Sequence, residues 1–195
     1  MAKLYMVRHA PVNIDPKVPP SDWQLSNDAQ ASVKQLVADH AWSDVSHIYY
    51  SPEPKAAATA AMMADQLGLA TSSCAALREV AMDTGFLPPS LFRQRVARFL
   101  NGEPDSAFEN YADATSRIVN AIASILEAAP KTSVAAVSHG RILTVFYSYL
   151  LGHRLGANEW QSIALPDLSI VNLTTSTVDS GFFAGNRVVN LPRIL

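Results

Sequence analysis

Short apolar runs that end in turn residues alternate with longer segments of helical periodicity. This alternation constrains the fold of the 195-residue chain more than any other feature. The runs with the length and composition of strands span residues 3–7, 46–50, 133–137, 169–174 and 182–189. The last is the weakest of these candidates, because Gly185 and Asn186 interrupt it.

Helical spacing of apolar residues occupies much of the chain between those runs. The helices predicted from this spacing span residues 27–40, 54–67, 89–100, 111–128 and 141–151. Strands that alternate with helices are typical of a parallel sheet covered on both faces. The sequence therefore predicts an α/β fold, a three-layer α/β/α sandwich with a mostly parallel central sheet, as one domain over residues 1–195.

Composition and charge exclude several other classes of protein. Hydrophobic residues make up 49% of the chain, which suits a packed core rather than disorder. The net charge is −2, and no basic run suggests nucleic-acid binding. The first apolar run is too short for a signal peptide, and no run reaches the roughly 18 residues of a membrane span. Cys74 has no partner for an internal disulfide. We expect a cytoplasmic protein that binds neither membranes nor nucleic acids.

Cationic and imidazole side chains follow three of the predicted strands. Arg8 and His9 follow the first, Lys55 lies just after the second, and His139 and Gly140 follow the third. The carboxyl ends of parallel strands meet at one edge of a sheet, where ligands bind. A single histidine there is most simply a structural residue, but two beside two cations favour a phosphoryl group as ligand. A neutral imidazole can attack phosphorus, and the free N–H groups of a helix that begins at Gly140 add anion affinity.

Together with their neighbours, these residues resemble the histidine phosphatase superfamily, also called the phosphoglycerate mutase-like superfamily. The family's signature is Arg-His-Gly at the end of the first strand. The matching motifs, in chain order, are Leu4-Tyr5-Met6-Val7-Arg8-His9-Ala10, Trp23-Gln24-Leu25-Ser26, Ser51-Pro52 with Thr59-Ala60, Leu77-Arg78-Glu79 and Val137-Ser138-His139-Gly140.

The resemblance implies a role for each matching catalytic position. His9 would be the nucleophile, and His139 would contact the phosphoryl oxygens and stabilise the transferring group. Glu79 would protonate the leaving group and then act as the base for water, with Asp83 as the alternative acid. The family uses no metal or organic cofactor, so none is expected here.

The resemblance also assigns phosphate binding to Arg8, which would hold and polarise the phosphoryl group, and to the position of Lys55. The family has arginine where this chain has Lys55, and glycine where it has Ala10. Lysine keeps the charge of arginine but loses its planar fork, so the grip on phosphate is expected to be less rigid.

The function that the resemblance implies is that of a metal-independent phosphatase that forms a phosphohistidine. The expected partner is a small phosphorylated substrate or a phosphoprotein. One alternative is a family member that binds phosphorylated ligands with little or no turnover. A mutase-type phosphotransferase is a weaker alternative, because the insert expected to cap the site, at about 80–110, is short.

Overall fold

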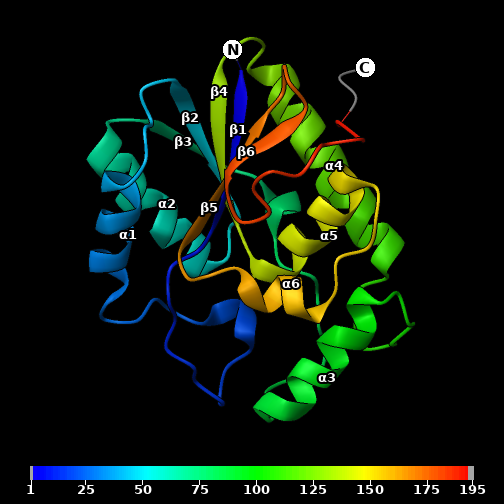
Figure 1. Ribbon diagram of the computed structural model, residues 1–195. Helices are drawn as coiled ribbons and strands as arrows, with labels where there is room; N and C mark the ends of the chain where they lie inside the picture. Colours follow the sequence, from blue (N-terminus) through cyan, green and yellow to red (C-terminus); the bar gives the residue numbers. More distant parts are fainter. Residues whose placement is uncertain (1, 193–195) are drawn as a thin grey trace.

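A computed structural model describes residues 2–192 of the chain (Figure 1). In this part of the chain six strands form one sheet, in the order β3-β2-β4-β1-β5-β6. The strands are β1 (Lys3–Arg8), β2 (Val45–Tyr50), β3 (Ala70–Ser73), β4 (Ser133–Ser138), β5 (Asp167–Asn172) and β6 (Thr177–Gly181). The first four pair in parallel, and β5 runs antiparallel to both of its neighbours. The predicted mostly parallel sheet is confirmed.

Helices cover both faces of this sheet, so the predicted three-layer sandwich is also confirmed (Figure 1). One face carries α1 (Ala29–Ala38) and α2 (Pro54–Leu67), and the other carries α4 (Tyr111–Ala128) and α5 (Gly140–Leu151). The remaining helices are the short η1 (Pro20–Asp22) and η2 (Ala75–Leu77), α3 (Pro89–Leu100) and α6 (Ala157–Ser162). Within residues 2–192, every helix falls short of the length and apolar character that crossing a bilayer requires.

Alternating side chains of the central strands form two separate cores. In β1, Leu4 and Met6 pack with the helices α3, α4 and α5, whereas Tyr5 and Val7 pack with α1 and α2. Because successive side chains of a strand point to opposite faces, a strand buried on both faces reads as a continuous apolar run. This explains why β1 and β4 are visible in the sequence as short, uninterrupted apolar segments.

The prediction of a strand at 182–189 is wrong. The last strand is β6, which precedes that segment and pairs with β5 as a hairpin. Phe182 and Val188 are nevertheless buried. Phe182 packs against Tyr147 of α5, with ring centroids 5.1 Å apart. The apolar character of this segment therefore reflects packing of a loop against a helix rather than strand formation.

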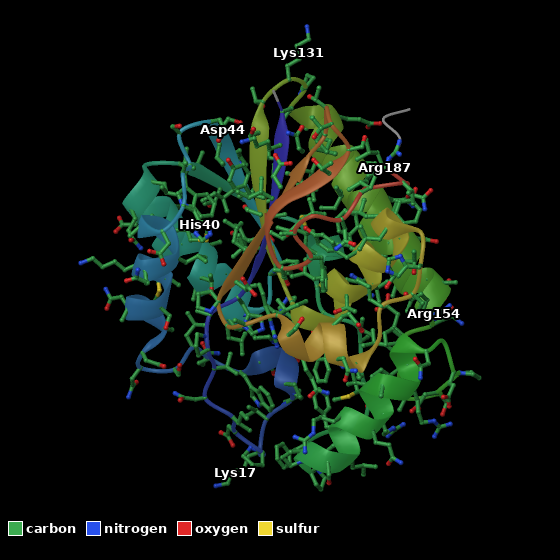
Figure 2. All side chains as sticks on the ribbon, in the orientation of Figure 1. Lys17, His40, Asp44, Lys131, Arg154 and Arg187 are labelled. Carbon is green, nitrogen blue, oxygen red and sulfur yellow. The ribbon has the colours of Figure 1, made fainter. Side chains whose placement is uncertain are left out.

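The parallel strands place their carboxyl ends at one edge of the sheet. Arg8, the last residue of β1, is in register with Ser138, the last residue of β4. In Figure 2, Lys17 in the loop after β1 lies at this end of the molecule, and Lys131, in the turn before β4, lies at the opposite end. Because α3 and α6 also lie at the end marked by Lys17, they border the edge where ligands bind in such folds (Figure 1).

Candidate active site

His9 directly follows β1, and its surroundings fix which ring nitrogen carries the proton. Its backbone N–H donates to the Ser138 carbonyl (3.0 Å), and its Nδ1 lies 2.8 Å from the Ala10 carbonyl oxygen. A carbonyl can only accept, so Nδ1 carries the hydrogen and Nε2 keeps its lone pair. The side chain is buried, and this burial lowers the pKa of His9 to about 3. At neutral pH the ring is therefore an uncharged potential nucleophile.

His139 caps the start of α5 and faces His9. The two imidazole rings meet edge to face, with centroids 5.1 Å apart. His139 Nε2 lies 2.7 Å from Ser51 Oγ. That hydroxyl accepts the Glu53 N–H (3.3 Å) and has one hydrogen of its own to donate. We assign this hydroxyl hydrogen to the bond with His139 Nε2, which leaves the ring hydrogen on Nδ1. Burial lowers the pKa of His139 well below its usual value, and the neighbouring His9 and the charge on Lys55 lower it further.

Arg8 lies against the first turn of α5, in close contact with Gly140. A Cβ atom on Gly140 would come within 3.0 Å of both Cζ and Nε of Arg8, and of Nε1 of Trp160. The Arg8 Nη1 atom donates to the Ile163 carbonyl at the end of α6, which anchors the guanidinium from the other side. A side chain at this position would therefore displace the Arg8 guanidinium by a few tenths of an ångström, so the close approach of Arg8 favours glycine here.

Two buried side-chain nitrogen atoms at this place have no hydrogen-bond partner in the described part of the chain. Among residues 2–192, Arg8 Nε and His139 Nδ1 are the only fully buried side-chain nitrogen or oxygen atoms without a hydrogen-bond partner. An unpaired buried donor costs about 1–3 kcal/mol, so such groups persist mainly where a ligand supplies the acceptor. Both donors flank the N-terminus of a helix, which itself favours an anion.

Glu79 lies at the same helix terminus. Its Oε1 atom accepts the N–H groups of Val80 and Ile142, both at 2.9 Å, and its Oε2 accepts that of Arg141 at 3.2 Å. Burial alone would raise the pKa of Glu79, but the Arg141 guanidinium and these N–H groups outweigh it and hold the pKa below its usual value. The carboxyl group is therefore ionised at neutral pH.

Asp83, the alternative acid, makes none of the side-chain contacts that join the residues of this cluster. Its side chain is exposed, and its backbone N–H donates to the Ala107 carbonyl at 2.8 Å. With Met82 and Phe108, Asp83 lines a shallow surface pocket of about 320 Å³. Of the two carboxylates considered from the sequence, Glu79 is the one held at the start of α5.

Lys55, the predicted phosphate ligand, is almost completely buried and already has two partners. Its Nζ atom donates to the Pro20 carbonyl at 2.8 Å and to Glu53 Oε2 at 2.6 Å. The charge on Lys55 contributes to lowering the pKa of both His9 and His139, so the ammonium group lies within electrostatic reach of both rings. One of its three N–H donors is left for a ligand.

Three residues that contact the site were not identified from the sequence. Glu53 is the partner of Lys55, and it lies between two prolines in a segment read only as a turn. Arg141 forms an ion pair with Glu79 (3.3 Å) and lies over the ring of Phe92 in α3. Its position directly after the His139-Gly140 motif is a signal that could have identified it.

Arg117 supports the site from α4, and no feature of the sequence marks it. Its Nη1 atom donates to the carbonyl groups of Ala76 (2.7 Å) and Arg78 (2.9 Å), just before Glu79. Its guanidinium also pairs with Glu109 through two hydrogen bonds of 2.7 and 2.8 Å. These contacts hold in place the segment that carries Glu79.

The cluster as a whole offers a neutral imidazole nitrogen opposite several donors. A tetrahedral anion with three or four acceptor oxygens fits this combination of groups. Within the described residues 2–192, no group of three or more His, Cys, Asp or Glu side chains is arranged to hold a metal ion.

Comparison with known proteins is consistent with this chemistry. The sequence profile of the histidine phosphatase superfamily (branch 1) matches residues 4–181. No curated protein matches the sequence significantly. Solved structures share the fold at low identity. YhfR of Bacillus stearothermophilus is 18% identical with a TM-score of 0.74, over 95% of this chain and 96% of that one.

Two other similar structures have names that state an activity. The phosphoserine phosphatase of Entamoeba histolytica, in complex with 3-phosphoglyceric acid, is 17% identical with a TM-score of 0.74, over 95% of this chain and 98% of that one. The mycobacterial glucosyl-3-phosphoglycerate phosphatase, in complex with VO3, is 16% identical with a TM-score of 0.67, over 88% of this chain and 91% of that one.

Proposed function

This chain belongs to the histidine phosphatase superfamily, and on that premise we propose that it hydrolyses phosphomonoesters through a phosphohistidine at His9. The observation that carries the proposal is that His9, whose Nε2 is an unprotonated imidazole nitrogen, lies beside His139 and next to Arg8 in the chain, and that His139 Nδ1 and Arg8 Nε are buried without a partner. A nucleophile that faces donors for phosphoryl oxygens is what attack at phosphorus requires.

In the first step, His9 Nε2 forms a bond to phosphorus while the bond from phosphorus to the ester oxygen breaks. Arg8 Nε and His139 Nδ1 donate to the phosphoryl oxygens, whose charge they help to stabilise. The departing oxygen takes a proton from Glu79 and leaves as an alcohol. Because Glu79 is ionised in the free protein, it must first gain a proton. The charge of an incoming phosphoryl group favours this, since a neighbouring anion raises the pKa of a carboxyl.

In the second step, water attacks phosphorus and the bond from phosphorus to His9 Nε2 breaks. Glu79, now a carboxylate, takes a proton from the attacking water. Inorganic phosphate leaves, and His9 returns to its neutral form with the hydrogen on Nδ1 bonded to Ala10. No metal ion takes part in these two steps, because cationic side chains and N–H donors stabilise the charge on the transferring phosphoryl group.

We propose a small phosphate ester of an alcohol as the substrate. The names of the amoebic and mycobacterial relatives, whose fold this chain shares, support this class over a phosphoprotein. The Glu79 segment and α3 would contact the leaving group, because Arg141 connects Glu79 to Phe92 of that helix. The protein is expected to act in the cytoplasm.

The test is release of phosphate from para-nitrophenyl phosphate with a chelator present, followed by a screen of phosphorylated small metabolites. Turnover that persists under chelation and is inhibited by vanadate supports the proposal. Loss of activity on chelation, restored by a divalent ion, would contradict the metal-free mechanism. Tight binding of vanadate without turnover of any substrate would instead identify a phospho-ligand-binding protein.

A further inference from the structure

Glu53 is a mostly buried carboxylate in direct contact with Lys55, the predicted phosphate ligand. It caps the start of α2, and its side chain is 13% exposed. Its Oε2 atom accepts from Lys55 Nζ at 2.6 Å, and its Oε1 accepts the backbone N–H of Glu79 at 2.7 Å. The same Oε1 atom lies 3.6 Å from His139 Nε2. One carboxylate thus contacts three positions with assigned roles in catalysis.

A negative charge here works against binding of a phosphoryl group, because like charges at short range repel. A compensating benefit is therefore expected, and the contacts point to Lys55 first. A free lysine side chain is flexible and presents only a point charge. Glu53 Oε2 and the Pro20 carbonyl fix two of the three ammonium donors. The third N–H is then held in one place, which supplies part of the rigidity that an arginine fork would give.

The second benefit concerns the charge state of His139. In the neutral form its Nε2 atom accepts from Ser51 Oγ. If the ring gains a proton, that proton sits on Nε2, close to Glu53 Oε1, and the carboxylate balances the new charge. An imidazolium at His139 donates to a phosphoryl oxygen more strongly than a neutral ring does.

Charges on every side of His139 act on this equilibrium. From β1 and the residue after it come Arg8 and His9, and from the beginning of α5 comes Arg141; together with Lys55 of α2 they oppose protonation. The carboxylate of Glu53, at the start of α2, and that of Glu79, in the loop after η2, counter the three cations Arg8, Lys55 and Arg141. A bound phosphoryl anion adds negative charge, so protonation of His139 becomes favourable mainly when the ligand is present.

We propose that Glu53 is a positioning residue of the phosphoryl site: it fixes the Lys55 ammonium group and stabilises the imidazolium form of His139 when a phosphoryl group binds. This inference rests on the proposed function for its catalytic consequence. The charge state of His139 in a complex with inorganic phosphate tests it without turnover.

The experiment is NMR titration of isotopically labelled His139 in the full-length protein saturated with inorganic phosphate. Glu53→Gln removes the charge but keeps an oxygen that can accept the Glu79 N–H. We expect this change to lower the pH midpoint of His139 protonation by about one unit or more. The alkaline limb of the kcat profile against pH should move in the same direction. Glu103→Gln, in an exposed ion pair with Arg98, is the matched control and should move neither.

If Glu53→Gln does not fold, Lys55→Met tests the inference in the opposite direction. It removes a cation that faces His139 and releases Glu53 from its partner, so the midpoint should rise. Midpoints in the folded variant that stay within about 0.2 pH units of the wild-type value, which corresponds to roughly 0.3 kcal/mol, would overturn the inference. A shifted midpoint in a protein without turnover would contradict the proposed function but support the role of Glu53.

Discussion

Gly140 and Arg8 lie so close together that a side chain at position 140 would press on the guanidinium: a Cβ atom there would be 3.0 Å from both Cζ and Nε, which is tighter than an ordinary contact. The backbone of Gly140 does not have a positive φ, so the close approach of Arg8, and not backbone conformation, favours glycine at this position. The guanidinium of Arg8 therefore lies directly against the first turn of α5.

Gly140→Ala should weaken anion binding without unfolding the protein. The added methyl group displaces Arg8 from its position, and a lost charge-assisted hydrogen bond of about 1.5–3 kcal/mol corresponds to a roughly 10-fold to 150-fold weaker inhibition by vanadate. The control is Gly156→Ala, where the nearest atom to the new Cβ, Glu159 Oε2, is 3.5 Å away. An inhibition constant that changes less than twofold in Gly140→Ala would show that Arg8 does not depend on this space.

The buried neutral histidines predict that stability falls as the pH decreases. The pKa of His9 is lowered to about 3 in the folded protein, so below about pH 6.5 the unfolded chain binds a proton that the folded protein does not. Stability is therefore lost on acidification through the window between the two pKa values. Replacing His9 by Ala should reduce the loss between pH 7.5 and 4.5 by about 2–3 kcal/mol.

Urea denaturation at both pH values measures this difference. His153→Ala is a control, because His153 is not among the fully buried histidines and follows α5 at the surface. Equal losses of stability in wild type and His9→Ala would show that the ring is protonated in the folded protein, and hence that it is not held as a neutral nucleophile.

Glu79→Gln should affect both turnover and stability. Loss of a general acid and base typically lowers kcat by about 100-fold to 10,000-fold. The pKa of Glu79 is held below its usual value, so its charge stabilises the folded state above about pH 4.3, and this contribution disappears as the pH falls through the folded pKa. The stability difference between wild type and variant should thus be present at pH 7 and shrink below pH 4.

The exposed carboxylate of Asp83 provides the comparison for that variant. If Glu79 is the acid, Asp83→Asn should keep most of the wild-type kcat, because its side chain makes none of the contacts at the start of α5. A large loss of kcat in Asp83→Asn together with near-normal turnover in Glu79→Gln would exchange the two assignments.

The elements predicted correctly from the sequence are mainly strands that are buried on both faces and helices that bury one continuous side. The strands β1 and β4 each contain four consecutive buried apolar residues between polar ends, so their limits are predicted within a residue. The edge strand β3 is not predicted from the sequence, because its residues Ala70–Ser73 are mostly exposed and carry no apolar pattern. The helix α6 is too short for helical periodicity, and Trp160 is its one buried residue.

The residues of the candidate site also fall into a predicted group and a group that the sequence does not predict. Two buried strands end at or just before four of the site residues, Arg8, His9, His139 and Gly140. Sequence order alone therefore predicts that these residues meet at one edge of the sheet. Glu53 differs, because its partners His139 and Glu79 are brought to it only by the packing of three separate segments. Arg117 is farther still from any motif, and its contacts with the carbonyls before Glu79 depend on how α4 packs.

Detection of a phosphohistidine at His9 tests the central claim most directly. Wild-type protein is mixed with a phosphomonoester substrate carrying labelled phosphate, quenched in denaturant at alkaline pH, and digested for mass spectrometry. We predict an acid-labile phosphoryl group on the peptide that contains His9, together with loss of both label and turnover in folded His9→Ala. Turnover in His9→Ala above a tenth of the wild-type rate, or labelling of another residue in the wild type, would contradict the account.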